Sequence, residues 1–306
     1  MSRDRRLDRR SVLTLVAATA AALTSGHAAA SPTGPPPGAR YRGYSPEDAA
    51  KPFARFMTEH TLAPLDSVAA ACAGPPVPVE RIPDFATLTT DLDATGYSAV
   101  ETGYGRTAAG VLWVAARTEM PRVSAAMWDW WFGWHSVDSA RYKLWHPDAH
   151  LFASSAVDRT AEPIPDRAKY VGNISYVDEY VGPKLQQLAI AFRDPVAHGF
   201  TVPAEQTVIF ARVGSAVAPV DLGWLAHQVR PTATGAEMRS RFYLNLYGLH
   251  VPDPAQAAGA ILRGAAVDPA DLVLQLDLAR DLLFHCGQEM HHLAGFLPEL
   301  YDEFRR

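Results

Sequence analysis

A chain of 306 residues in which 48% of the side chains are hydrophobic and 20% are charged has the composition of a globular protein with a large buried core. Beyond residue 30 it contains no run of Lys and Arg, which argues against nucleic acid as a partner. Its two cysteines, Cys72 and Cys286, are too few for a disulfide scaffold, although they could pair in an oxidising compartment.

The first thirty residues have the features of a cleaved signal peptide. Five arginines precede an apolar run from Val12 to Leu23, and a run of small residues ends at Ala30, just before Ser31. A membrane anchor is the alternative, but the apolar run is shorter than the roughly 20 residues that a span needs. We therefore expect residues 1–30 to be removed and no stable membrane anchor to remain. Without the five Arg and two Asp of this segment, 23 basic and 31 acidic residues are left, a net charge of −8.

The pair Arg9-Arg10, followed by Ser11-Val12-Leu13, favours export by the twin-arginine route. That route carries proteins that have already folded, often with a metal or cofactor in place. The general secretory route remains the alternative, because extra arginines are common in such leaders. Either route predicts an exported protein, secreted or periplasmic.

Four regions follow the leader in chain order. Residues 31–40 are rich in Pro and Gly and predict an extended linker. Residues 41–90 form a small N-terminal helical region with predicted helices over 46–60 and 63–73, the first opening at Ser45-Pro46. The main domain is expected to span 91–306.

Within the main domain, four segments rich in β-branched and aromatic residues predict strands. These segments are 110–118, 207–213, 224–229 and 236–246. The stretch 230–235 contains Pro and Gly and predicts a hairpin turn between the last two. Alternation in the last strand separates two sets of residues onto opposite faces. One set is Glu237, Arg239 and Arg241, and the other is Met238, Ser240 and Phe242.

A Trp-rich segment, 122–140, predicts helix between the first two strands, and the clearest helix closes the chain. Asp268-Pro269 caps that last helix, and its apolar stripe continues until Pro298. Strands gathered before one long C-terminal helix predict an α+β fold, in which a curved antiparallel sheet wraps around the helix.

The last helix also carries the first candidate metal ligands. His285 and Glu289 are four residues apart, so their side chains lie on one helix face and could reach a single ion. A surface hydrogen bond is the ordinary alternative for such a pair, but the apolar neighbours indicate a buried face. His291 and His292 are competing ligands, and His292, seven residues after His285, could share that face.

Three further groups could contribute to a site, and each has an ordinary structural alternative. The first holds His146, Asp148 and His150 beside Tyr142, in a run that could instead be a polar loop. The second is Asp178-Glu179 inside an apolar stretch, where acids are usually solvated. The third is His227 in the middle of a predicted strand, where a satisfied core histidine is the ordinary interpretation.

Five blocks of sequence together resemble the 2,4-diacetylphloroglucinol hydrolase family, which is related to phloretin hydrolase. They occur in the family's order over most of the chain after about residue 90. The blocks are MWDWWFGWH (127–135), RYKLWHPDAH (141–150), YVDEYVG (176–182), GAEMRSRFYL (235–244) and HCGQEMHHLAGFLPELY (285–301).

This resemblance implies a Bet v 1-like (START-type) helix-grip fold with a zinc site of two histidines and two glutamates. The implied ligands are His150, Glu179, His285 and Glu289. His150 is chosen over His146 and His135 because the family places a tyrosine eight residues before this ligand, and that position is Tyr142. His227 matches the family's active-site histidine, and with Tyr142 it is expected to transfer protons or orient phenolic oxygens. The family also suggests a homodimer.

Two positions depart from the family pattern. Its second active-site tyrosine falls on Phe242, with Tyr243 on the opposite strand face, and a polar residue three after the first ligand falls on Ala153, with Ser154 beside it. The metal site would be kept, while some contacts to substrate hydroxyls would be lost. The implied substrate is thus a small aromatic ketone, an acylated phenol, whose identity these departures leave open.

The implied reaction is zinc-dependent hydrolysis of the carbon–carbon bond between an acyl group and a phenolic ring. The competing hypothesis is a non-catalytic START-like carrier of an apolar aromatic ligand, because folds of this shape often only bind such molecules. A zinc peptidase or amidase would share the metal, but the sequence lacks an H-E-x-x-H helix.

Overall fold

The computed structural model describes residues 43–218, 220–245 and 274–305, and one antiparallel sheet dominates these segments. Its eight strands follow the order β1-β2-β8-β7-β6-β5-β4-β3. The strands are β1 (Gly103–Arg106), β2 (Leu112–Pro121), β3 (His150–Ser155), β4 (Ile174–Val181), β5 (Lys184–Arg193), β6 (Thr207–Ser215), β7 (Asp221–Pro231) and β8 (Gly235–Leu244). The leader and the linker expected over residues 1–40 lie outside the described residues, as does the predicted start of the last helix.

The four strands predicted from β-branched and aromatic runs are all present, as β2, β6, β7 and β8. β7 and β8 form the expected hairpin, with Pro231 opposite Ala236. The other four strands were not predicted. Adjacent polar pairs, Asp178-Glu179 in β4 and Gln186-Gln187 in β5, weaken the hydrophobic signal of these strands. β3 begins at His150, inside the run that could have been a polar loop.

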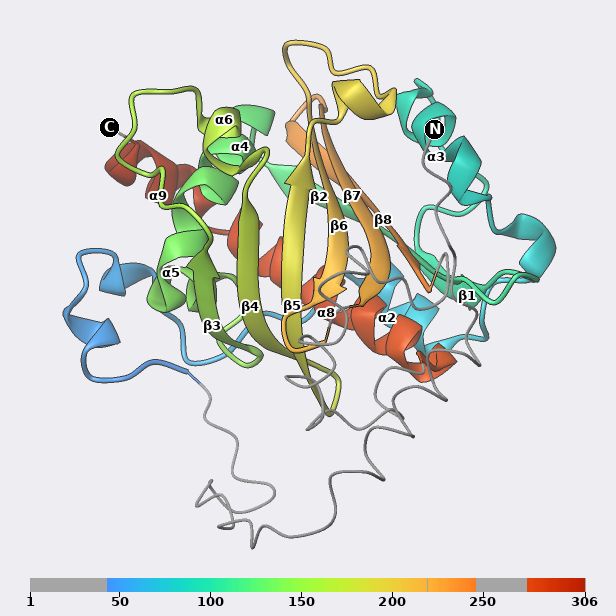
Figure 1. The fold of residues 1–306 in the computed structure, drawn as a ribbon, viewed down its shortest axis with the longest axis horizontal. Coiled ribbons are helices and arrows are strands. Elements are labelled where there is room, and N and C mark those ends of the chain that lie inside the picture. The colour runs from blue at the N-terminus through green and yellow to red at the C-terminus, as the bar shows by residue number, and fades with distance from the viewer. Residues whose placement is uncertain (1–42, 219, 246–273, 306) are drawn as a thin grey trace, which may run out of the picture.

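The sheet curves around the long C-terminal helix α8 (Leu276–Ala294), which lies against one face of it (Figure 1). Helix α8 contacts β1, β2 and β4, and we call the face that it covers the inner face. This arrangement confirms the predicted α+β fold with a curved antiparallel sheet around the last helix. The predicted end of α8 at Pro298 is wrong, because the helix stops at Ala294 and Pro298 lies in the first turn of a separate helix, α9 (Leu297–Phe304).

The N-terminal segment is less helical than predicted. Over 46–60 the structure has two short 3-10 turns, η1 (Asp48–Ala50) and η2 (Ala54–Phe56), instead of one helix. Lys51 between them is extended, because a residue that precedes proline, here Pro52, is disfavoured in the helical region. The second predicted helix is confirmed as α2 (Asp66–Ala73), which packs on α8 with Val68 against Gly287.

The remaining helices cover one end of the inner face and part of the outer face. The Trp-rich segment forms two helices, α4 (Ala125–Trp134) and α5 (Ser139–Trp145), because Asp138 caps a new helix by accepting a hydrogen bond from the Ala140 amide at 2.8 Å. The other elements are α6 (Asp166–Tyr170), α3 (Leu88–Asp93) and the 3-10 turns η3 (Val79–Arg81), η4 (Phe85–Thr87), η5 (His135–Val137) and η6 (Val196–His198).

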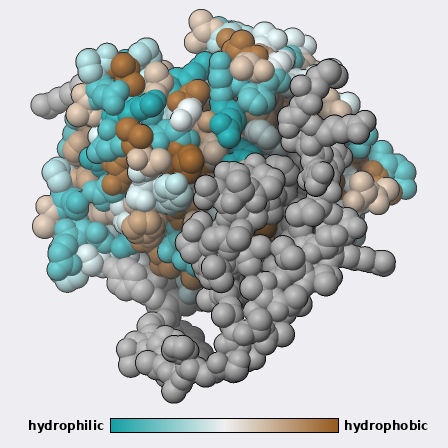
Figure 2. All heavy atoms as spheres, viewed as in Figure 1, coloured by the Kyte–Doolittle hydropathy of each residue, from teal (hydrophilic) through white to brown (hydrophobic). Residues whose placement is uncertain are grey.

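The two faces of the sheet bury separate sets of side chains. Met238 and Phe242 belong to the larger core between the sheet and α8, whereas Tyr243 belongs to a smaller core beneath α3 on the outer face. The alternation predicted for this strand is therefore confirmed. Figure 2 shows hydrophobic patches scattered among hydrophilic ones over the described part of one side of the molecule. Among the described residues, no helix is both long enough and apolar enough to cross a membrane.

The two cysteines are not paired. Cys286 is buried on α8, and Cys72 is partly exposed at the end of α2, where its sulfur lies 3.7 Å from the backbone oxygen of Arg280. The disulfide that the sequence left open is therefore absent from this structure.

Candidate active site

The middle of α8 presents His285 and Glu289 to the inner face, one helical turn apart. Both side chains are buried, with the His285 Nε2 atom 3.8 Å from a Glu289 oxygen. His285 Nδ1 lies 3.1 Å from the backbone oxygen of Tyr180 on β4. A carbonyl oxygen can only accept, so Nδ1 carries the proton and the Nε2 lone pair is free to bind a ligand.

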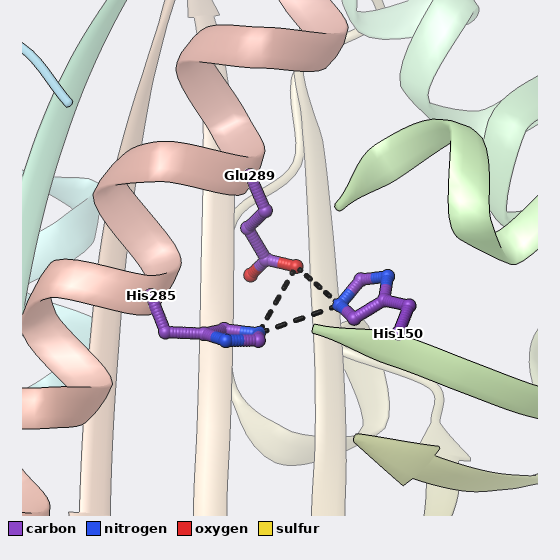
Figure 3. A group of neighbouring side chains, drawn as sticks. All are labelled: His150, His285 and Glu289. Atoms are coloured by element: carbon purple, nitrogen blue, oxygen red, sulfur yellow. Dashed lines mark hydrogen bonds and ion pairs between the residues drawn. The ribbon is translucent and has the colours of Figure 1, made fainter. Parts of the chain in front are cut away.

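His150, the first residue of β3, meets this pair from the opposite side (Figure 3). Its side chain is fully buried, and its Nδ1 atom donates to the backbone oxygen of Tyr142 at 2.9 Å. The Tyr142 ring stacks on the imidazole with centroids 3.7 Å apart and an interplanar angle of 4°. As in His285, the proton on Nδ1 leaves the Nε2 lone pair free.

The ligand atoms of His150, His285 and Glu289 converge. The two Nε2 atoms are 3.4 Å apart, and a Glu289 oxygen lies 3.5 Å from that of His150. All three ligand atoms lie within 4.8 Å of one another, and the three residues are buried. Two imidazole lone pairs and a carboxylate oxygen cannot donate hydrogen bonds to one another, so this donor set fits a cation.

Glu179 lies at the edge of this group, on β4 next to His150 in the strand pairing. Its Oε2 atom is 3.6 Å from His150 Nε2 and accepts a hydrogen bond from the Tyr142 hydroxyl. The structure therefore brings all four implied ligands together, with Glu179 held by Tyr142 at one side of the three converging residues.

Electrostatics at the group also favour a cation. Burial and then the nearby Glu179 raise the pKa of Glu289 well above its ordinary value. Burial and then His285 lower the pKa of His150 well below its ordinary value, and burial lowers the pKa of His285. The neighbours of Glu289 are therefore a second carboxylate and uncharged imidazoles, so its buried carboxylate has no counter-charge. An unpaired charge of this kind is costly in a protein interior.

A cavity opens beside the group, between α8 and the inner face. It is lined mainly by aromatic and aliphatic side chains, and both Tyr142 and His227 reach it. Burial and then Glu179 raise the pKa of Tyr142 well above its ordinary value, so the phenol keeps its proton. His227 Nδ1 lies 2.8 Å from the Ser240 hydroxyl, and burial lowers the pKa of His227 to about 3. The imidazole is therefore neutral near pH 7.

The two departures noted in the sequence have clear structural consequences. Phe242 lines the cavity, so a ring without a hydroxyl occupies that place. Tyr243 does not replace it, because its hydroxyl points to the outer face and donates to the backbone oxygen of Pro83 at 3.2 Å. Ala153 is buried on β3 outside the cavity lining, where its amide donates to the Ser139 hydroxyl.

The competing candidate ligands are engaged elsewhere. His146 stacks on His285 at 4.7 Å and bonds Thr61 through Nδ1 at 2.7 Å, and it lies outside the converging group. His292 Nδ1 accepts from the Leu62 amide at 3.2 Å. Asp148 accepts from the Thr61 amide at 2.8 Å, and Asp178 lies 3.4 Å from the side-chain nitrogen of Gln187.

Sequence reasoning missed two polar residues of the cavity, His135 and Ser175. His135 stacks between Trp131 and Tyr142, at 4.8 Å and 5.9 Å, and Ser175 is a buried residue of β4. His135 was considered only as a ligand, and its place in the Trp-rich block was the available signal. Ser175 lies two inward positions before Glu179, so the alternation of β4 would have placed it on the same face.

Fold and site together define an α+β enzyme class in which a sheet wrapped around a helix encloses an aromatic cavity with a group able to bind a metal. The family model described as the DAPG hydrolase PhiG domain matches residues 82–302. The chain therefore belongs to the 2,4-diacetylphloroglucinol hydrolase family and is a hydrolase.

Named relatives agree with this membership. The chain is 26% identical to 2,4-diacetylphloroglucinol hydrolase of Pseudomonas protegens over 265 residues, 83% of this chain and 85% of that protein. It is 30% identical to phloretin hydrolase of Eubacterium ramulus over 256 residues, 80% of this chain and 88% of that protein. The crystal structure of Ara h 8.0201 aligns over 62% of this chain and 99% of its own, at 10% identity and a TM-score of 0.35, so the fold class here depends on the strand order and on α8.

Proposed function

We propose that this protein is a zinc-dependent hydrolase that cleaves the carbon–carbon bond between an acyl group and a phenolic ring of the phloroglucinol type. The observation that carries the proposal is the buried group of His150, His285 and Glu289 at the wall of an aromatic cavity. The substrate class comes from the relatives, whose names are 2,4-diacetylphloroglucinol hydrolase and phloretin hydrolase.

The reaction requires water to add to the ketone and the ring carbon to leave with the bonding electrons. A bare aryl carbanion would be too unstable to form. Hydroxyl groups around the ring allow it to take up a ketone form, so that the leaving group becomes an enolate. The enzyme must therefore hold the phenolic oxygens and supply a proton to the departing ring carbon.

Four side chains would hold the ion: His150, Glu179, His285 and Glu289. Imidazole nitrogens and carboxylate oxygens are ordinary zinc ligands, and the Nδ1 contacts of both histidines fix their orientation. Bound there, zinc would polarise the substrate carbonyl and favour ionisation of water near neutral pH.

We infer that Tyr142 and His227 handle the protons. The Tyr142 hydroxyl keeps its proton and donates a hydrogen bond to Glu179, so its oxygen is left to accept a hydrogen bond from a phenolic hydroxyl of the substrate. His227 is neutral, and because Ser240 engages Nδ1, Nε2 is the nitrogen left for a phenolic oxygen or the ring carbon. The aromatic walls exclude bulk water from the ring.

Turnover of acylated phloroglucinols by purified protein tests the proposal. We expect equal amounts of the free phenol and the carboxylic acid, detected by liquid chromatography, with loss of activity after chelation and recovery with added zinc. Tight binding of the ketone without either product, in protein loaded with zinc, would contradict the hydrolase and favour the carrier.

We also propose that residues 1–30 direct export by the twin-arginine route. The support is the Arg9-Arg10 pair before a short apolar run. N-terminal sequencing of protein recovered outside the cytoplasm should begin at Ser31, and replacement of both arginines by lysine should retain the precursor. A full-length N-terminus in the membrane fraction would support an anchor instead.

A further inference from the structure

The cavity is chemically different at its two ends, and the candidate metal group lies between them. One end lies against α4 and holds Phe132, whose ring lies 5.4 Å from His135, 5.5 Å from Trp145 and 6.4 Å from His227. The other end lies at the start of α8. We call them the α4 end and the α8 end.

The α4 end contains polar atoms that have no partner among the described residues. These are the Ser175 hydroxyl and the Trp145 indole N–H, on residues that are 3% and 6% exposed. Ser175 belongs to this end because it pairs with Ser155, whose hydroxyl contacts Ser136 beside His135. Buried polar groups usually have a partner, and these two belong to residues that line the cavity, so both are available to a ligand that bears oxygen atoms.

The α8 end is aliphatic. Its lining comes from the start of α8, the start of β7 and the end of β8. β7 and β8 meet there because Gly223 pairs with Leu244, which also pairs with Leu112 of β2. The start of α8 lies nearby, since Arg106 at the end of β1 donates to the backbone oxygen of Leu274. The residues of this end are Leu222, Leu244, Leu274, Leu278 and Leu282. A hydroxylated ring would lose hydrogen bonds there, whereas an alkyl chain would lose none.

Position along the elements places the metal group between these ends. Leu278 precedes His285 by seven residues, about 10 Å along a helix. Ser175 precedes Glu179 by four residues, roughly 13 Å along β4. A ketone carbonyl at the metal group would therefore direct its two substituents toward opposite ends.

We propose that the phenolic ring binds at the α4 end, with Ser175 and Trp145 contacting its oxygens, and that the α8 end binds an extended apolar acyl chain. The preferred substrates are acylphloroglucinols whose acyl group is several carbons longer than acetyl. This inference rests on the proposed function, because it assigns the substituents of the same ketone.

A series of monoacylphloroglucinols tests the assignment in the zinc-loaded protein, with acetyl, butanoyl, hexanoyl and octanoyl chains. We expect kcat/KM to rise about fourfold per methylene until the α8 end is filled, the factor that corresponds to burial of one methylene group. If the acetyl compound is cleaved best and longer chains progressively slow the reaction, the inference is wrong while the proposed function stands. If no member of the series is cleaved, the proposed function itself fails.

Two variants separate the ends, with a matched control. Leu278→Phe should flatten the dependence on chain length by filling the α8 end, whereas Leu276→Phe, on the same helix but outside the cavity lining, should keep it. Ser175→Ala should lower kcat/KM about tenfold or more by the same factor for every chain, because it loses a contact to the ring. A Ser175→Ala effect that grows with chain length would show that the acyl chain binds at the α4 end and would overturn the assignment.

Discussion

The two faces of the sheet bury charged groups in opposite ways. On the outer face, Arg239 and Arg241 are fully buried, and each donates to Glu101 at 2.8 Å. Arg241 also bonds Asp91 at 3.1 Å. On the inner face, by contrast, Glu179 and Glu289 lie beside uncharged imidazoles. The outer group contains guanidinium groups and carboxylates, whereas the inner group contains carboxylates and uncharged imidazoles.

The pKa values of Glu101 on the outer face and Glu289 on the inner face differ for this reason. Burial alone would raise the pKa of Glu101, but hydrogen bonds from Arg239 and the charge of Arg241 outweigh it and lower the value to about 2. The same burial raises the pKa of Glu289, and Glu179 raises it further. Glu101 is thus held by cationic partners inside the protein, whereas Glu289 has none and is available to a ligand with positive charge.

The largest effect should come from removing a ligand on the inner face. His285→Ala should lower kcat/KM roughly a thousandfold or more and remove most of the bound metal, because several kcal/mol of carbonyl polarisation is lost. Steady-state kinetics and metal analysis measure both. The control is His291→Ala on the same helix, whose ring contacts the Ala63 backbone oxygen outside the cavity. A His285→Ala protein that loses metal but keeps its activity would refute the mechanism.

The outer face should respond in stability and not in metal content. Glu101→Gln leaves two buried guanidinium groups with only Asp91 as an acidic partner, and breaking such a pair costs about 3 to 5 kcal/mol. Urea unfolding should show a loss of about 3 kcal/mol, with zinc per folded chain unchanged. A parallel loss of zinc would mean that the two faces are not independent.

Tyr142 tests the contact between the metal group and the cavity. Tyr142→Phe removes the hydroxyl that bonds Glu179 but keeps the ring that stacks on His150, so kcat should fall about a hundredfold while zinc is retained. Kinetics on zinc-loaded protein with measured zinc content provide the comparison. Unchanged kcat would remove Tyr142 from the proton chemistry.

The smallest effect concerns the pH dependence of stability on the inner face. His227 has a pKa of about 3 in the folded protein and about 6.5 when unfolded, so the unfolded chain takes up the proton first. This contribution is fully present above pH 6.5 and is lost as the pH falls from 6.5 toward 3; at pH 5 the loss is about 2 kcal/mol. His227→Gln should show a smaller fall in unfolding free energy between pH 7 and 5. An equal fall in both proteins would contradict the buried, neutral state of His227.

Much of this organisation follows from the sequence, but not evenly. The strands that became β2, β6, β7 and β8 carry continuous β-branched and aromatic residues, so their signal is local. The alternation in β8 predicted which side chains face each way. β5 was not predicted because Gln186 and Gln187 interrupt its apolar pattern. The helix predicted over 46–60 is interrupted at Lys51, because the proline that follows disfavours the helical conformation of this residue.

The site was less accessible to sequence reasoning than the fold. Spacing on one helix could pair His285 with Glu289, but the approach of His150 and Glu179 depends on pairing between β3 and β4, which only the family resemblance supplied. The functions proposed for Ser175 and Trp145 depend on which buried polar atoms lack hydrogen-bond partners. Those atoms can be identified only from a three-dimensional structure that contains all their neighbours. Contacts between distant segments set these properties, so local patterns carry little signal for them.

The metal content of the purified protein is the most direct test of the proposed site. We expect a single zinc ion per chain by elemental mass spectrometry, lost together with the activity on dialysis against a chelator and regained together with it on adding zinc. The Glu289→Gln protein should contain no zinc, while the Glu101→Gln protein should contain as much as the wild type. Wild-type protein that lacks stoichiometric metal, yet is active and unaffected by the chelator, would contradict a zinc-dependent site.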